Sequence, residues 1–454
     1  MSTANFKASR KPTENPEIFK TRRQKITKAI LGQDGNATAL IVASHPELIR
    51  NDDVHYLHRQ DSNLYYLTGF EEPESILLLR PGKNPESVMF VRNKNVERET
   101  WDGFRFGPEG TQKEFGIDQV YSIDQFVAKS TELLSGFENV YYRMFKNTEV
   151  DRQFESLLLN LKRSFGRSGY GLLTVKDADT FLGEFRLIKD HTDLANQRKA
   201  CEISAQAHVK AMKGTKPGMS ERQVQALLVA EFYKNGAARE GYNHIVASGN
   251  SATTLHYNFN DQVCEDGELL LIDSGAEYNY YSGDITRCYP VNGKFSPAQK
   301  KVYAGVLKIQ KEIINFIKPG IFFKDLHEMG TNLLIDLMFE LNLVNGRKED
   351  VLKSLEYKKY YPHGVGHWLG MDVHDAGLYF IKGKPRPIEA GMVFTVEPGL
   401  YIPGADKTAP AELRGIGIRI EDNVLVTDKG CEVLTSTVPK EIAEIEAIVG
   451  TDFN

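Results

Sequence analysis

Long apolar runs, closely spaced cysteines and a strong excess of either charge are all absent from this 454-residue sequence. The four cysteines (Cys201, Cys264, Cys288 and Cys431) show no CxxC spacing, which favours reduced thiols over a disulfide framework or a zinc knuckle. No apolar run approaches the length that crosses a membrane, and the polar start, MSTANFKASRKPTENPEIFK, has no apolar signal core. We therefore expect a cytoplasmic protein that has no membrane partner.

The charge balance also excludes a class of partner. A net charge of −5 offers no basic surface to a polyanion, so nucleic acid is not an expected partner. The hydrophobic fraction of 41% and the charged fraction of 26% are those of an ordinary globular chain. The length predicts two to three domains, each large enough to bury its own core.

The first 185 residues predict an α/β domain. A basic amphipathic helix is expected at 16–31, and strands are expected at 38–44, 74–80, 87–91 and 140–143. Residues 97–110, ERETWDGFRFGPEG, predict an irregular glycine-rich loop that carries Trp101. A loop tryptophan is usually buried against the local core, and a flat wall for a ligand is the alternative. The mixed segment 166–183 shows no periodicity, so we place the boundary at its end, which gives domains 1–185 and 186–454.

The second domain begins with helices whose ends carry capping signals. A long helix is expected at 192–213, and Ser220 with Gln223 gives a capping box for the helix that follows. The pattern returns at 296–299, where a helix to about residue 317 precedes a second helix that ends at Asn345-Gly346. The two Lys-Pro-Gly sequences between these helices are offset by 102 residues (318 − 216). This weak internal repeat predicts two related α/β halves within one domain.

The stretch at 269–290, LLLIDSGAEYNYYSGDITRCYP, predicts a β-hairpin with Asp273 and Asp284 on its two arms. The first arm is an apolar run of strand length, and Asn279 tolerates turn geometry. Ten residues separate the aspartates (284 − 273 − 1 = 10), so a loop of two or four residues would place them directly opposite each other. The strand is too apolar to be exposed, and two close carboxylates require a metal ion or a proton.

A glycine-rich segment at 361–375, YPHGVGHWLGMDVHD, concentrates three histidines, His363, His367 and His374. Its glycines argue against a helix, so the spacing is not that of an HExxH zinc site. A single histidine is more often structural, but three within twelve residues favour a functional site.

Two strand-like segments supply further charged groups. The segment GMVFTVEPGLYI at 391–402 places Glu397 at the end of a strand, directly before Pro-Gly. The segment GIGIRIEDNVLV at 415–426 sends Arg419 and Glu421 to one strand face. That face is either a surface ion pair or the wall of a cleft.

Together these segments supply four carboxylates and one imidazole, from Asp273, Asp284, Glu397, Glu421 and His367. Four negative charges cannot share a small cavity unpaired, whereas two divalent cations would balance them. An oxygen-rich set with one nitrogen and no thiolate favours a hard ion such as Mn²⁺, with Co²⁺, Zn²⁺ and Fe²⁺ also fitting. Paired metals activate water and polarise a carbonyl, so the residues predict a dinuclear metallohydrolase.

The order DSG…GDITR, HGVGHWLG…VHD, TVEPGLY and GIGIRIEDN resembles the pita-bread metallopeptidases of family M24, and most closely the aminopeptidase P family. The stretch DSNLYYLTGFEEPESILLL at 61–79 resembles the N-terminal domain of the creatinase/prolidase type. The resemblance covers almost the whole chain. It implies an α/β (α+β) protein with an aminopeptidase P-type N-terminal domain at 1–185 and a pita-bread catalytic domain at 186–454.

The resemblance also implies a role for each matching residue. Asp273 would bind one metal ion, His367 and Glu397 would bind the other, and Asp284 and Glu421 would bridge both. The catalytic positions it implies are His256, Glu397 and His374, and the substrate-contacting positions are His363, Arg419, Tyr401 and Trp101. Trp101 matches an aromatic residue that reaches a neighbouring subunit's active site in related tetramers, so a homodimer or homotetramer is expected.

The implied activity is release of the N-terminal residue from peptides that have proline in second position. Prolidase, which cuts Xaa-Pro dipeptides, shares the metal site and stays open as the alternative. Methionine aminopeptidase is disfavoured because such enzymes typically lack a large N-terminal domain of this type. The complete ligand set argues against a non-catalytic pita-bread binding protein and against a metal-free creatine-type hydrolase.

Overall fold

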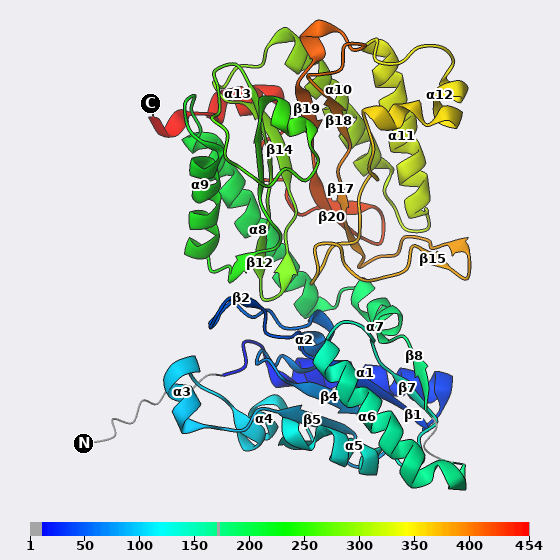
Figure 1. Cartoon of the computed structure of the whole chain (residues 1–454). Coiled ribbons are helices and arrows are strands. Elements are labelled where there is room, and N and C mark those ends of the chain that lie inside the picture. The colour runs from blue at the N-terminus through cyan, green and yellow to red at the C-terminus, as the bar shows by residue number, and fades with distance from the viewer. Residues whose placement is uncertain (1–10, 170–172, 454) are drawn as a thin grey trace, which may run out of the picture. The chain divides into compact units, whose positions relative to one another are not determined.

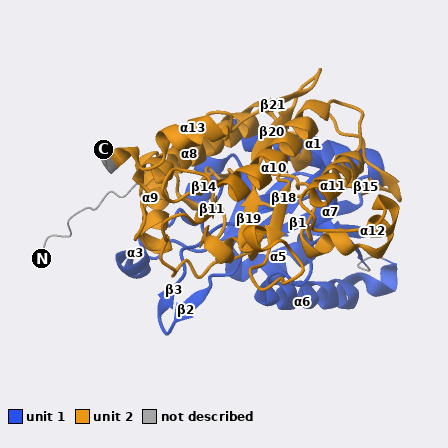
Figure 2. Ribbon diagram, turned by 90° about the horizontal axis from the view of Figure 1, so that it is seen from above, with its two compact units in different colours: residues 1–185 blue, residues 186–454 orange. Residues whose placement is uncertain are grey.

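The computed structural model describes residues 11–169 and 173–453, so residues 170–172 of the mixed segment lie outside the described part. The chain forms two compact units, Met1–Phe185 and Arg186–Asn454 (Figure 2). Within the described residues, none of the helices combines the length and the apolar character that a membrane span needs.

The first unit is built on a mixed six-stranded sheet of order β6-β5-β4-β1-β7-β8 (Figure 1). β1 pairs antiparallel with β4 and parallel with β7, and its apolar run is buried as expected for a covered central strand. The strands are β1 (Thr38–Ala43), β4 (Ile76–Leu79), β5 (Ser87–Val91), β6 (Gln119–Ser122), β7 (Asn139–Tyr141) and β8 (Thr174–Lys176). A separate hairpin joins β2 (Ile49–Asn51) and β3 (Val54–His55).

The expected N-terminal helix and the four expected strands are confirmed, but the expected loop at 97–110 is wrong. That segment contains the helix α3, which Asn95 caps through its side chain, and the start of the helix α4 at Gly107-Pro108. Trp101 lies in α3 and is 81% exposed, so its side chain is not buried against the local core. The helices are α1 (Pro16–Asp34), α2 (Ser62–Thr68), α3 (Val96–Asp102), α4 (Gly107–Phe115), α5 (Phe126–Leu133), α6 (Thr148–Phe165) and α7 (Ala178–Leu187).

The second unit contains two helix pairs, which confirms the repeated helical pattern. These are α8 (His191–Gly214) with α9 (Glu221–Lys234), and α10 (Pro297–Phe316) with α11 (Phe323–Glu340). Both expected capping boxes are present, and the glycines of the two Lys-Pro-Gly turns have positive φ angles of 87° and 92°. The helix α11 was expected to end at Asn345-Gly346 but ends at Glu340, five residues before Asn345, because Asn342 turns the chain with a φ of 55°.

Short sheets lie between the two helix pairs (Figure 1). Three three-stranded sheets among the described residues of this unit have the orders β10-β11-β14, β13-β12-β9 and β17-β20-β21, and β18 pairs with β19. Their strands are β10 (Ile245–Ser248), β11 (Leu269–Asp273), β14 (Thr286–Pro290), β17 (Val393–Val396), β18 (Gly399–Ile402), β19 (Ile416–Arg419), β20 (Asp422–Val426) and β21 (Cys431–Val433). Smaller elements are β9 (Arg239–Glu240), β12 (Ala276–Tyr278), β13 (Tyr281–Ser282), β15 (Phe380–Ile381), β16 (Lys384–Pro385), α12 (Lys348–Ser354) and α13 (Ile442–Ile448).

The hairpin that carries the two aspartates has a different register from the one expected. Its two-residue turn is 279–280, where both residues have positive φ angles, and Asp273 therefore pairs with Thr286 instead of Asp284. A turn one residue earlier, at 278–279, would have paired Asp273 with Asp284, so the shift of the turn by one residue moves the partner of Asp273 by two residues. Because side chains alternate with a period of two, Asp273 and Asp284 are diagonal neighbours on one face.

Replacing Gly275 by alanine is expected to destabilise the hairpin. A Cβ atom there would lie 1.8 Å from the carbonyl oxygen of Gly283 on the partner strand, so the strands must part. We expect the free energy of unfolding, measured by urea titration, to fall by about 1–3 kcal/mol. Gly430→Ala is the control, because the nearest atom to its Cβ is 3.7 Å away. Equal stability of the two variants would contradict this account of the hairpin.

Candidate metal centre

The predicted metal ligands line one cavity of about 600 Å³ in the second unit. Asp273 ends β11 and Asp284 precedes β14, so both come from the first α/β half. Glu397 follows β17 and Glu421 precedes β20, so both come from the second half. Val396 pairs with Asp422, and the two glutamates continue that register beyond the strand ends. Each half therefore contributes two carboxylates at the ends of a pair of neighbouring strands.

Asp284, His367 and Glu421 form the tightest part of the cluster. Their ligand atoms all lie within 4.8 Å of one another, and His367 Nε2 is 3.3 Å from Asp284 Oδ2. Glu397 joins them, with its Oε1 atom 3.6 Å from His367 Nε2. Donors that share an ion are at most about 4 Å apart because each is about 2 Å from it, and the distances of 3.3 Å and 3.6 Å fall within that limit. The donor set therefore fits a divalent cation.

Asp273 lies beside this cluster and is held by two further residues. The Tyr242 hydroxyl is 2.6 Å from Asp273 Oδ1 and 2.6 Å from Asp284 Oδ1, so it links the two aspartates. Arg419 donates from Nη2 to Asp273 Oδ2 at 2.6 Å. Arg419 and Glu421 are 4% and 1% exposed, which decides for a cleft wall over a surface ion pair.

Two of these supporting residues were not predicted from the sequence. Thr286 donates to Glu421 Oε2 at 2.6 Å and accepts from Arg419 Nε at 3.0 Å. Its position two residues after Asp284, on the same strand face, was a usable signal. Tyr242 lies in a connecting segment before β10, where the sequence carries no periodic signal.

Burial opposes ionisation of three of the acidic groups when no cation balances them. Burial raises the pKa of Glu397 to about 7, and burial also raises the pKa values of Asp284 and Glu421 above their usual range. For His367, burial favours the neutral ring, but the hydrogen bond and charge of Asp284 outweigh it and raise the pKa to about 9. A bound cation would take the place of these protons.

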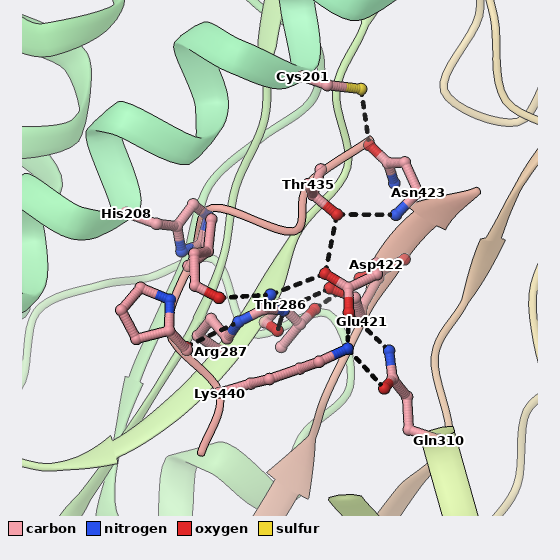
Figure 3. Close-up of polar contacts among 12 residues, drawn as sticks. Cys201, His208, Thr286, Arg287, Gln310, Glu421, Asp422, Asn423, Thr435 and Lys440 are labelled. Carbon is pink, nitrogen blue, oxygen red and sulfur yellow. Dashed lines mark hydrogen bonds and ion pairs between the residues drawn. The ribbon is translucent and has the colours of Figure 1, made fainter. Parts of the chain in front are cut away.

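A buried charge network lies next to Glu421 (Figure 3). Arg287 and Asp422 are fully buried, and Arg287 Nη2 donates to Asp422 Oδ1 at 2.7 Å. Arg287 also donates to the main-chain carbonyls of Glu421, at 2.6 Å, and of Thr286, at 3.0 Å. Lys440 donates to Asp422 Oδ2 at 2.6 Å. Although burial opposes ionisation, these cations lower the pKa of Asp422 to about 2, so the network ties β14 to β20.

The predicted substrate-contacting histidines surround the same cavity. His363 Nε2 is 2.8 Å from the Tyr401 hydroxyl, which accepts from Arg419 Nη1 at 2.9 Å. Burial lowers the pKa of His363 to about 3, so its ring is neutral near pH 7. His256 and His374 line the cavity with exposed side chains, and the His374 ring lies 4.2 Å from that of His367.

Trp101 is the one predicted site residue that belongs to the first unit, and it does not line this cavity. All of the other predicted residues line the cavity except Tyr401, which reaches it through His363 and Arg419. Four carboxylates and an imidazole in an accessible cavity define the site of a metal-dependent hydrolase.

Comparisons with known proteins specify the family. The sequence model of metallopeptidase family M24 matches residues 195–428, and that of the aminopeptidase P N-terminal domain matches residues 19–141. The Xaa-Pro aminopeptidase of Haemophilus influenzae is 37% identical, over 95% of this chain and 97% of the relative. That of Escherichia coli is 35% identical, over 95% and 98%. The chain belongs to metallopeptidase family M24 and has the aminopeptidase P N-terminal domain.

Solved structures agree with this assignment. Aminopeptidase PepP of Pseudomonas aeruginosa superposes with a TM-score of 0.90 at 41% identity, covering 94% of this chain and 97% of that chain. Zinc-substituted Escherichia coli aminopeptidase P in complex with product gives a TM-score of 0.90 at 36% identity, covering 96% and 98%. The expected fold, an N-terminal α/β domain and a pita-bread metallopeptidase domain, is therefore confirmed.

Cation binding is expected to release protons. At pH 7, Glu397 is about half protonated and His367 is charged, and both must lose their protons to bind a metal. Affinity should therefore rise as the pH rises through the range from 7 to 9. Titration calorimetry with Mn²⁺ at pH 7, in two buffers of different ionisation enthalpy, should give different heats. Identical heats in both buffers would show that no proton is released, and Asp284→Ala serves as the non-binding reference.

Proposed function

We propose that this protein is a metal-dependent Xaa-Pro aminopeptidase, which releases the N-terminal residue from peptides that have proline in second position. The observation that carries the proposal is the convergence of all five predicted ligands on one cavity. The Xaa-Pro aminopeptidase relatives, which match 95% of the chain, favour this activity over that of prolidase. The complete ligand set argues against a binding protein without catalysis.

We assign two divalent ions to the site, with Mn²⁺ as the preferred ion and Co²⁺, Zn²⁺ or Fe²⁺ as substitutes. Asp273 would hold one ion, His367 and Glu397 the other, and Asp284 and Glu421 both. The position of Asp284 supports this division, since it is linked to Asp273 through Tyr242 and lies 3.3 Å from His367. The bound ions would supply an activated water and polarise the scissile carbonyl.

The side chains around the ions would orient the peptide and move its protons. Glu397 lies between the rings of His367 and His363, so it can pass a proton from the attacking water to the leaving proline nitrogen. The exposed rings of His256 and His374 can contact the reacting carbonyl. The carboxylates attract the ammonium group at the peptide's N-terminus.

Proline itself would be recognised by shape. Its nitrogen carries no hydrogen in a peptide, so it cannot serve as the donor on which other peptidases rely. His363 and Arg419 line the cavity and are joined through the Tyr401 hydroxyl, so together they offer a rigid wall to the ring. This wall is held in place by the bond from Arg419 to Asp273.

We also propose a homo-oligomer in the cytoplasm. The first unit exposes large apolar side chains, among them Leu57, Val96 and Trp101, each more than three-quarters exposed. A second copy of this chain is the proposed cover for them. The four free cysteines support a reducing compartment.

The oligomer proposal predicts an effect of Trp101 on catalysis. If Trp101 reaches a neighbouring subunit's site, Trp101→Ala should lower kcat/KM for a tetrapeptide by about tenfold, the loss of about 1.4 kcal/mol of contact. Phe145→Ala is the control, because Phe145 is similarly exposed in the same unit. Equal kcat/KM values for the two variants would overturn the role of Trp101.

The activity itself can be tested with two substrates in the presence of Mn²⁺. We expect a Xaa-Pro-Yaa-Yaa tetrapeptide to yield the free first residue, and Asp284→Ala to give a rate at least about 10²-fold lower because the shared carboxylate is gone. Cleavage of a Xaa-Pro dipeptide alone would establish a prolidase. A chain that turns over neither substrate with any divalent metal would be a binding protein.

A further inference from the structure

A second pocket, of about 420 Å³, adjoins the metal cavity in the second unit. The two share His363 and Gly364 in their linings, so the pocket begins where the proposed proline wall ends. Its other walls come from the start of α11, from the 3₁₀ helix Glu356–Lys359 and from the start of β15. We name it the aromatic pocket, after Phe323, Tyr357, Tyr361, Tyr379 and Phe380.

Closely packed aromatic rings form an apolar surface at the base of this pocket. Phe323 packs against Tyr379 with ring centres 5.0 Å apart, and Tyr379 stacks on Trp368 at 4.9 Å. Phe380 at the rim is 51% exposed, so a large apolar surface remains open to a ligand. Such a surface fits an aromatic or large aliphatic side chain.

Two buried polar atoms at the pocket lack a partner. Among the described residues, nothing hydrogen-bonds to the Tyr361 hydroxyl or to His327 Nδ1, although both atoms are inaccessible to solvent. Tyr361 is itself fully buried. Leaving a buried polar group unpaired costs about 1–3 kcal/mol, so these two atoms make the pocket wall locally unfavourable.

The charged side chains that line the pocket indicate the charge of the group that it would bind. Lys324 and Lys358 line it, and Lys324 Nζ lies 3.2 Å from Glu328 Oε1. Lys358 has no carboxylate within ion-pair distance in the described part of the chain. The pocket is therefore net positive and complements an anion.

We propose that the aromatic pocket binds the part of a peptide substrate that follows its proline. A large apolar side chain packs on the rings, and the free C-terminal carboxylate faces Lys324 and Lys358. The shared His363 wall carries the peptide from one cavity to the other. This inference rests on the proposed aminopeptidase activity, and it adds a preference for short peptides with an apolar residue after proline and a free carboxylate.

The test compares Xaa-Pro-Phe-Phe as the free acid and as its C-terminal amide, with Xaa-Pro-Gly amide as a short reference. The double variant Lys324→Glu/Lys358→Glu reverses the pocket's charge. Lys353→Glu is the matched control, because Lys353 is exposed on α12 and does not line the pocket. Phe380→Ala removes part of the apolar rim.

We expect the unaltered enzyme to cleave the acid with a kcat/KM about tenfold above that of the amide, and the double variant to abolish or reverse this ratio. The control should keep the ratio, and all variants should cleave the short reference within about twofold of one another. Phe380→Ala should lower kcat/KM for both phenylalanine peptides but not for the short reference. An unchanged acid-to-amide ratio in the double variant would overturn the pocket assignment alone, whereas no turnover of any substrate by the unaltered enzyme would overturn the activity as well.

Discussion

The structure depends on one electrostatic constraint, which is that four carboxyl groups face a single cavity. Burial raises the pKa values of three of them, Asp284, Glu397 and Glu421, so it opposes the build-up of negative charge in the site when no cation is bound. Divalent ions remove that conflict and turn an unfavourable cluster into a binding site. Metal binding, proton release and catalysis are therefore linked through the same side chains.

The two-fold internal repeat explains how the chain brings these groups together. Each half supplies a helix pair and a strand pair, and each strand pair contributes two carboxylates where the strands end. The buried pair of Arg287 and Asp422 then joins the halves, since Arg287 also holds the carbonyls of Thr286 and Glu421. Removing the Asp422 carboxylate would leave the buried charge of Arg287 without its ionic partner, at a cost of about 3–5 kcal/mol.

Much of this architecture was predictable because its signals are local. The capping boxes at Ser220 and Ser296 and the apolar run before Asp273 each specify an element within a few residues. The register of the hairpin was not predictable, since a shift of its turn by one residue keeps the same alternation of side chains. The expected loop at 97–110 was wrong for a related reason, because the glycine-rich sequence gives little sign of the short helix α3, on which the Trp101 side chain is exposed.

The residues of the site also fall into a group that was predictable from the sequence and a group that was not. The five metal-ligand candidates lie in recognisable sequence motifs. Tyr242 and the buried charge network around Asp422 are instead specified only by tertiary contacts. Lys440 meets Asp422 across a gap of 18 residues, and Arg287 meets it across 135. No periodicity in a single sequence predicts such partners.

The most direct test of the account is anomalous diffraction from a crystal of the Mn²⁺-loaded protein. Two anomalous peaks should appear in the cavity, about 3.5–4 Å apart, with Asp284 and Glu421 contacting both. A single peak would contradict the dinuclear assignment. Peaks that lie away from Asp273, Asp284, His367, Glu397 and Glu421 would contradict the central claim that these side chains form the metal centre.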